Sequence, residues 1–178
     1  MLRKDSSDED LVLSFQKTQS EKIFEYLYDR HASFVYSKSL LLTGSEADAQ
    51  DVTQEIWVKV YLGLNSFRLE SKFSRWLNRI TINSCINYLK RRDKLFFSED
   101  IEEGANGSFS DMNHIFDVTK LLSRLSIKNK VLLTLKYVDE FSYEAISELT
   151  GMGVSAVKMR IARAKKELIK YSLTTDLK

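Results

Sequence analysis

The segment FSYEAISELTGMGVSAVKMRIARAKKELIK, residues 141–170, contains two helical patterns separated by two glycines. Ser142 can cap the first helix, and Gly151 can end it because glycine readily adopts the left-handed conformation that follows many helices. The second helix is expected to begin near Val154 or Ser155. Two helices joined by a Gly-containing turn predict a helix-turn-helix. The apolar residues of the second helix fall on one arc, which we expect to face the core: Val154, Val157, Ile161, Ala164 and Leu168.

The opposite face of the second helix is basic. Such a helix fits the major groove of DNA, where Arg and Lys meet guanine and phosphates. The lysines of its last turns, Lys165, Lys166 and Lys170, are expected to hold phosphates rather than to read bases. An ordinary helical hairpin with a solvated basic face would give the same pattern. The residues of this face are Ser155, Met159, Ala162, Arg163, Lys166 and Lys170, flanked by Lys158 and Arg160.

Charge is distributed unevenly along the 178 residues, although the net charge is only +2. Residues 68–94 carry eight Lys or Arg against two acidic residues, and residues 151–171 carry six against one. Between them, residues 95–117 carry six acidic residues and no basic one. Two basic blocks separated by an acidic one are compatible with solvated faces or with nucleic-acid binding.

The fold class is predicted to be all-α. The chain contains no proline and no sustained apolar/polar alternation, and residues 98–114 have the Gly, Ser and acidic composition of a linker. Further breaks are expected at residues 43–45, 63–66, 139–141 and 151–153. We therefore predict two small helical domains, residues 1–94 and 118–178, joined by a flexible acidic linker over residues 95–117.

Several classes of protein are disfavoured. Cys85 is the single cysteine and there are only two histidines, so an internal disulfide is excluded and a zinc centre is not expected. The apolar runs are too short to span a bilayer and no signal peptide opens the chain, which predicts a cytoplasmic protein without membrane insertion.

A second candidate surface is expected on a helix over residues 73–92. Its polar arc carries Arg and Asn at a spacing of four, which suits nucleic-acid contact, although the arginines could instead pair with the acidic N-terminal part. Ile82 and Ile86 lie within the same arc, so part of it should be buried. Phe67 and Trp76 could stack on bases but are interpreted first as core residues. The arc comprises Lys72, Arg75, Arg79, Asn83, Asn87 and Lys90, and the opposing face comprises Phe73, Leu77, Ile80, Ser84 and Tyr88.

A third surface lies in the segment DAQDVTQEIWVKVY, residues 48–61. Asp51, Gln54 and Glu55 form one polar patch beside an apolar stripe. Carboxylates this close could bind a catalytic metal, but no third ligand or general base is evident nearby, so a protein-binding surface is favoured. The stripe comprises Ala49, Val52, Ile56 and Val60.

Taken in order, three motifs resemble the sigma factors of bacterial RNA polymerase. They are DVTQEIWVKVY (residues 51–61), NSFRLESKFSRWLNRITINSCINYLKRR (residues 65–92) and FSYEAISELTGMGVSAVKMRIARAKKEL (residues 141–168). The chain is similar to the small extracytoplasmic-function group of the sigma-70 family, which keeps only regions two and four. The resemblance covers residues 11–94 and 118–168, and it implies a non-enzymatic protein without cofactor or metal.

The resemblance also implies a division of labour. Core RNA polymerase would be bound through the clamp helices of its largest subunit and through its flap, with Asp48, Asp51, Gln54 and Glu55 on the clamp-binding patch. The promoter's −10 element would be recognised, and an unstacked base captured near residues 65–72, by Arg68, Lys72, Arg75, Arg79, Asn83, Asn87 and Lys90. The −35 element would be bound by Ser155, Lys158, Met159, Arg160, Ala162, Arg163 and Lys166. Most relatives are held by an anti-sigma factor, so such a partner is expected.

Two departures from the family pattern stand in the helix-turn-helix. Gly153 occupies a turn position where many members have proline or serine, and Met159 and Ala162 replace polar or aromatic readers, which would favour a thymine methyl group. Two alternatives remain open. A stand-alone helix-turn-helix regulator would bind its operator tightly without polymerase, and a helical interaction module would bind no DNA.

Overall fold

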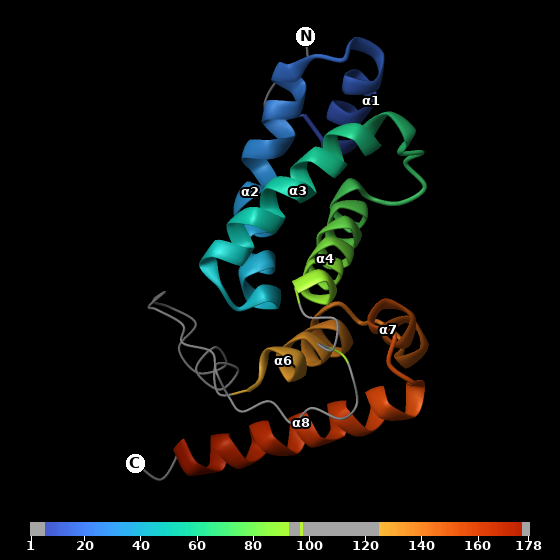
Figure 1. Ribbon diagram of the computed structural model, residues 1–178. Coiled ribbons are helices and arrows are strands. Elements are labelled where there is room, and N and C mark those ends of the chain that lie inside the picture. Colours follow the sequence, from blue (N-terminus) through green and yellow to red (C-terminus); the bar gives the residue numbers. More distant parts are fainter. Residues whose placement is uncertain (1–5, 93–96, 98–124, 176–178) are drawn as a thin grey trace. The chain divides into compact units, whose positions relative to one another are not determined.

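The computed structural model describes residues 6–92, 97 and 125–175, with side chains described up to residue 170. Its regular elements within these ranges are helices (Figure 1), as predicted. They are α1 (Asp8–Thr18), α2 (Glu21–Thr43), α3 (Glu46–Gly63), η1 (Leu64–Ser66), α4 (Phe73–Arg92), α6 (Ile127–Leu133), η2 (Thr134–Val138), α7 (Tyr143–Thr150) and α8 (Val154–Thr175). None of the described helices is long and apolar enough to span a bilayer.

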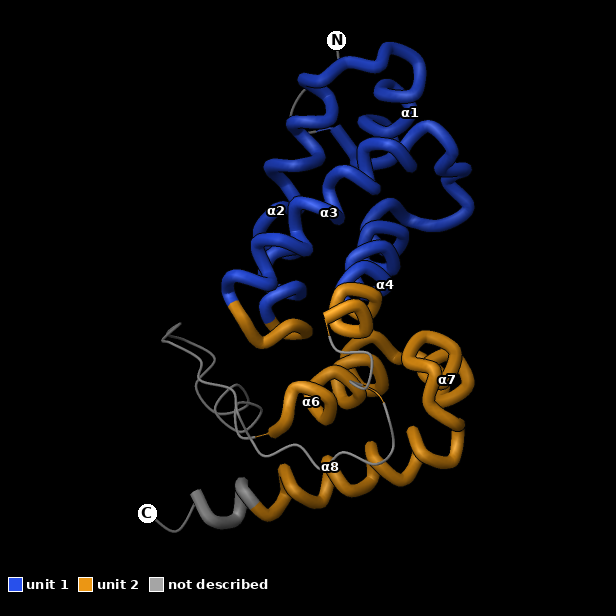
Figure 2. The backbone as a smooth tube through the Cα atoms, in the orientation of Figure 1, with its two compact units in different colours: residues 1–40, 46–85 blue, residues 41–45, 86–178 orange. Residues whose placement is uncertain are grey.

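Two compact units are distinguished by the contacts within the chain (Figure 2). The first comprises residues 1–40 and 46–85, and the second residues 41–45 and 86–178. The line between the units falls within α4. The predicted linker over residues 95–117 lies outside the described residues except for Phe97, so the division at that linker stays a prediction.

The first unit is a helical bundle built on apolar stripes with helical spacing. The predicted stripe of α3 is confirmed, because Ala49, Val52, Ile56 and Val60 have no exposed surface. α1 contributes Leu11, Val12 and Phe15 to the same core. Aromatic side chains pack edge to face around it, with ring centroids 5.5 Å apart for Phe15 and Tyr61. Each fully buried side chain of this size contributes about 1.5–3 kcal/mol, so these stripes are sufficient to hold the helices together.

The second unit contains the helix-turn-helix. Ser142 caps α7, since its hydroxyl accepts from the Ala145 amide at 3.1 Å, and Gly151 ends the helix with φ +81°. Both caps and the start of α8 at Val154 confirm the predictions. The predicted core arc of α8 is confirmed for Val157, Ile161 and Ala164, which are buried where α8 packs on α6 and α7 (Figure 1), while Val154 and Leu168 at its ends are half-buried.

Two features of the fold were not expected from the sequence. The chain breaks at residues 18–20, where Gln19 adopts φ 52° and separates α1 from α2. Helix α6 continues into the π-helix η2, whose first two carbonyls, of Thr134 and Leu135, accept from the amides of Asp139 and Phe141. Neither position carries glycine or proline, the residues that usually mark such breaks in a sequence.

Candidate nucleic-acid interface

The polar face of α4 is exposed over only part of its length, and its last member, Lys90, is half-buried with its Nζ donating to the Leu149 carbonyl at 2.7 Å. Arg75, Arg79 and Asn87 are exposed, and Asn83 is half-buried between them. Ile82 and Ile86, which directly precede Asn83 and Asn87 in the sequence, are buried. This confirms that part of the predicted arc faces the core. Helix α4 therefore carries a row of hydrogen-bond donors at a spacing of four residues.

The opposite side of α4 places a serine and a cysteine in the core. Ser84 is buried and its hydroxyl accepts from Lys59 Nζ at 3.0 Å. Next to it, burial raises the pKa of the Cys85 thiol from 9.0 to about 11, against the lowering effect of a hydrogen bond to Ser39. Because the thiolate is the nucleophilic form of cysteine, Cys85 is a core residue rather than a reactive group.

The segment between α3 and α4 begins with an aromatic stack. Phe67 is buried and stacks on Trp76, with ring centroids 4.7 Å apart and planes inclined by 22°. A Cβ atom on Gly63 would lie 3.0 Å from Trp76 Cζ2, so a side chain there would require the indole to shift by a few tenths of an ångström. The core interpretation is confirmed for Phe67, while Trp76 is half-buried.

The rest of this segment is open to solvent. Arg68, Glu70 and Lys72 are exposed. Leu69 has φ 57°, a left-handed conformation that is unfavourable for a bulky side chain. Arg68 and Lys72, both predicted to bind DNA, therefore project from a strained turn in front of α4.

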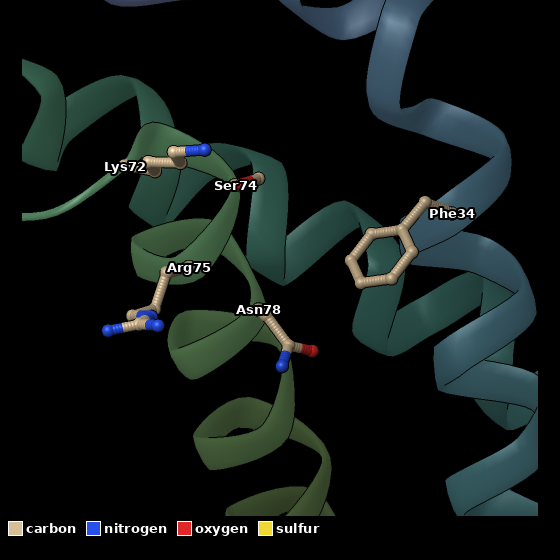
Figure 3. Close-up of a pocket in the computed structure, with 5 residues that line it drawn as sticks. All are labelled: Phe34, Lys72, Ser74, Arg75 and Asn78. Atoms are coloured by element: carbon tan, nitrogen blue, oxygen red, sulfur yellow. The ribbon is translucent and has the colours of Figure 1, made fainter. Parts of the chain in front are cut away.

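A pocket of about 540 Å³ opens between α2 and the start of α4 (Figure 3). The ring of Phe34 extends from α2 toward α4, and the Asn78 amide projects from α4 toward it. Phe34 is 44% exposed, unusual for a phenylalanine of a bundle. Lys72, Ser74 and Arg75 complete the lining. An aromatic face and an amide border one concavity, while the Arg75 guanidinium extends away from the Phe34 ring (Figure 3).

Sequence reasoning missed Phe34 and Asn78. Phe34 adjoins the buried Val35 on α2, so its position on the helix does not distinguish it from a core residue. Asn78 lies outside the four-residue spacing that marked Arg75 and Arg79. The pocket depends on the packing of α2 against α4, for which the sequence carries no local signal.

The predicted polar patch on α3 extends further than expected. Asp51 and Gln54 are exposed, and Asp48 and Glu55 are half-buried. Two apolar residues continue the same face, Val58 and Leu62, with 59% and 71% of their surface exposed. Their spacing of seven and eleven residues from Asp51 is helical and could have revealed them. A polar patch followed by exposed apolar residues is typical of a protein interface.

The outer face of α8 is exposed where the sequence predicted it. Ser155, Lys158, Met159, Ala162, Arg163 and Lys166 are all exposed. Arg160 differs, because it is half-buried and its Nε donates to Asn129 Oδ1 of α6 at 3.2 Å. Asn129 Nδ2 also donates to Glu167 Oε2 at 3.4 Å, so this amide links α6 to two positions of α8.

The start of α8 faces the start of α7 through charged and aromatic groups. The ammonium groups of Lys136 and Lys158 lie 4.5 and 5.4 Å from the centroid of the Tyr143 ring. Hydrogen bonds from the Glu144 backbone and Ser142 lower the pKa of the Glu144 carboxyl, and both lysines add to this effect. Lys158 is therefore oriented by α7 while it remains exposed.

These surfaces can bind rather than transform a ligand. Exposed Arg, Lys and Asn side chains can donate hydrogen bonds to phosphates and base edges, and the exposed Phe34 ring offers an aromatic face. The strongest basic faces, on α4 and α8, coincide with the two basic blocks of the sequence.

Comparisons with known proteins agree with this geometry. Residues 27–95 match "Sigma-70 region 2" and residues 115–168 match "Sigma-70, region 4". The chain is 33% identical over 178 residues to the ECF RNA polymerase sigma-E factor of Haemophilus influenzae, covering 90% of this chain and 92% of that protein. It is 25% identical over 170 residues to the ECF RNA polymerase sigma factor SigW of Bacillus subtilis, covering 86% and 91%.

A solved structure with a similar fold is the sigma factor RpoE in complex with the anti-sigma factor NepR, from Bartonella quintana. The TM-score is 0.52 at 23% identity, and the match covers 84% of this chain and 96% of the other.

Proposed function

The chain belongs to the extracytoplasmic-function sigma factors of the sigma-70 family, non-enzymatic proteins that direct transcription initiation, and we propose that three of its surfaces divide this work. The α3 patch binds core RNA polymerase, the α4 face with the Phe34 pocket binds the −10 element, and the outer face of α8 binds the −35 element. The observation that carries the proposal is that the two exposed basic helix faces lie within the residues that match regions 2 and 4.

The α3 patch is proposed to dock on the clamp helices of the largest polymerase subunit. Asp51, Gln54 and Glu55 supply polar specificity, while Val58 and Leu62 supply the apolar area that a stable contact requires. The flap of the polymerase is a second expected contact. The exposed apolar residues beside the polar patch make this face suited to contact with another protein.

The −10 element is proposed to be bound partly as single strand. Arg75, Arg79, Asn83 and Asn87 line the exposed side of α4, with Arg68 and Lys72 before it and Lys90 on its last turn. The Phe34 ring offers a stacking surface to one unpaired base, and the Asn78 amide nitrogen can donate to the edge of that base. The free energy that opens the duplex would then come from binding of the unpaired strand, without a covalent step.

The −35 element is proposed to lie against α8. Arg163 and Lys158 can reach base edges, and Met159, with 56% of its surface exposed, can contact a thymine methyl group together with Ala162. Ser155 and Lys166 are placed to hold the backbone. Arg160 is half-buried and its Nε is engaged by Asn129, which leaves contact with a phosphate to its Nη groups, so its contribution is expected to be smaller.

An anti-sigma factor is a further proposed partner. The similar fold of the RpoE–NepR complex supports this proposal, because a sigma factor there is held by such a protein. The exposed α3 face and the basic faces are the surfaces that an inhibitor would need to cover.

The proposal is tested by binding with and without polymerase. The purified chain should co-purify with bacterial core RNA polymerase, and the pair should enrich particular duplexes from a random pool. The chain alone should enrich few. Tight, selective binding by the chain alone would favour the stand-alone regulator, and failure to co-purify with the core enzyme would overturn the proposal.

A further inference from the structure

Helix α1 holds both ends of the segment between α3 and α4. The Gln16 side chain reaches the first end, where its Nε2 donates to the carbonyls of Leu64 and Phe67, both at 2.8 Å. These carbonyls belong to residues about fifty positions further along the chain. One amide therefore fixes the turn η1 at its start and just after its end.

A second amide pair supports the same turn. Gln19 Nε2 donates to Asn65 Oδ1 at 2.6 Å, and Asn65 Nδ2 donates back to Gln19 Oε1 at 3.2 Å. The contact is reciprocal, so each side chain satisfies the other.

The far end of the segment is held by Glu9. Its Oε1 accepts from the backbone amide of Phe73, the first residue of α4, at 3.1 Å. The first amides of a helix lack intrahelical partners, and a carboxylate there is favourable. Asp8 anchors the start of α1 itself, through His31 at 2.8 Å and through Arg30.

The segment between these fixed ends is strained. Leu69 adopts its left-handed conformation there, and such a conformation persists only when the surrounding structure determines it. The exposed Arg68 and Lys72 stand on either side of it. A loop held at both ends also loses less conformational entropy when it binds a ligand than a free loop does.

We propose that α1 is a positioning element for this segment, with Gln16 as its principal positioning residue. Its role is to hold residues 64–73 ready for the unpaired strand of the −10 element. Helix α1 precedes residues 27–95, the part that matches region 2, so the match to region 2 does not include it. The identity of the ligand in this inference rests on the proposed function. The positioning role itself rests only on the hydrogen bonds described above.

The first experiment uses the Gln16→Met variant of the full chain. Methionine keeps the length and the helix propensity of glutamine but removes both donors. The matched control is Lys17→Met, which introduces the same side chain at the next, exposed position. The probe is a non-template-strand oligonucleotide carrying the −10 element of a duplex selected by the wild-type holoenzyme.

Gln16→Met holoenzyme should bind this oligonucleotide roughly tenfold more weakly, which is the effect of losing about two hydrogen bonds. Its affinity for core polymerase and for a −35 duplex should equal that of wild type, and Lys17→Met should leave all three affinities within about twofold of wild type. Equal affinity of the two variants for the oligonucleotide would overturn the positioning role. Equal losses on all three ligands would show a general folding defect instead.

Hydrogen exchange separates this inference from the proposed function. In the free chain, Gln16→Met should speed amide exchange at residues 64–73 and leave the central amides of α3 unchanged. That result is expected even if the wild-type chain fails to bind polymerase. Unchanged exchange at residues 64–73 would contradict the positioning role whatever the chain binds.

The reciprocal amide pair provides a rescue test. Gln19→Asn shortens one arm of the pair and Asn65→Gln lengthens the other, while the double variant restores the total length. Each single variant should weaken oligonucleotide binding, and the double variant should regain most of the loss. Additive losses in the double variant would show that the two side chains act separately.

Discussion

At the scale of single residues, Arg163 and Lys166 illustrate two kinds of DNA contact on one helix face. Arg163→Ala should remove about 1–3 kcal/mol of preference at one base pair, the usual size of a direct contact to a base edge. Lys166→Ala should weaken binding to all sequences alike and reduce the salt slope by about one contact. Titrations of the holoenzyme on selected and scrambled duplexes at several salt concentrations measure both effects. Parallel losses on both duplexes for Arg163→Ala would make it a phosphate contact.

Phe34 carries a separate prediction because it is the aromatic surface of the pocket. Phe34→Ala should weaken binding of the unpaired −10 strand by about 1–3 kcal/mol, the usual value of base stacking, while Phe34→Tyr should retain most of the affinity. Core binding should be unchanged for both variants. Binding to the oligonucleotide, measured by fluorescence anisotropy, checks this. Equal affinity of the Ala and Tyr variants would exclude a stacking role.

At the scale of elements, the turn of the helix-turn-helix depends on two glycines in different ways. Gly151 has φ +81°, whereas Gly153 precedes α8 and its carbonyl accepts from Val157 at 3.0 Å. Gly151→Ser should destabilise the chain by about 1 kcal/mol, because a side chain is unfavourable in the left-handed region. Gly153→Ser should be neutral or stabilising, since serine is a better N-cap. Thermal unfolding of the two variants measures this contrast, and a loss of the same size in both would contradict it.

The sequence predicted the helices and their buried faces more accurately than the contacts between helices. The bounds of α4, the buried stripe of α3, the middle of the stripe of α8, and the caps Ser142 and Gly151 all follow from local spacing and conformational preference, and all are confirmed. The break at Gln19 and the π-helix η2 were missed because neither carries glycine or proline, although Ser20, which directly precedes α2, is a residue that favours helix starts. The assignment of individual side chains to polymerase or DNA stays a prediction.

The candidate site shows why the remainder could not be predicted. The contact of Gln16 with Leu64 and the approach of Phe34 to Asn78 join residues more than forty positions apart. Periodicity indicates which face of a helix is buried but not which element covers it. Arg160 belongs to the basic face by spacing, yet Asn129, far earlier in the chain, turns it inward.

At the scale of the whole molecule, the α3 patch should decide whether the chain acts with polymerase. Asp51→Lys combined with Glu55→Lys should reduce core binding strongly, because reversed charges at a polar interface are repulsive. Glu21→Lys combined with Glu25→Lys on α2 is the matched control, with the same spacing and the same change of charge. Co-purification with core enzyme and circular dichroism of both variants check this. Retention of the α3 variant on core enzyme at the control's level would place the docking surface elsewhere.

The central claim is that this chain directs initiation by bringing core polymerase to a promoter and opening it. Run-off transcription from a selected duplex, with core enzyme alone and with core enzyme plus the chain, tests it most directly. The account predicts a transcript with one defined start only when core enzyme and the chain are both present. The same start should be used on a template that is already melted around the −10 element. A chain that binds core enzyme and the selected duplex but yields no defined transcript on either template would contradict the account.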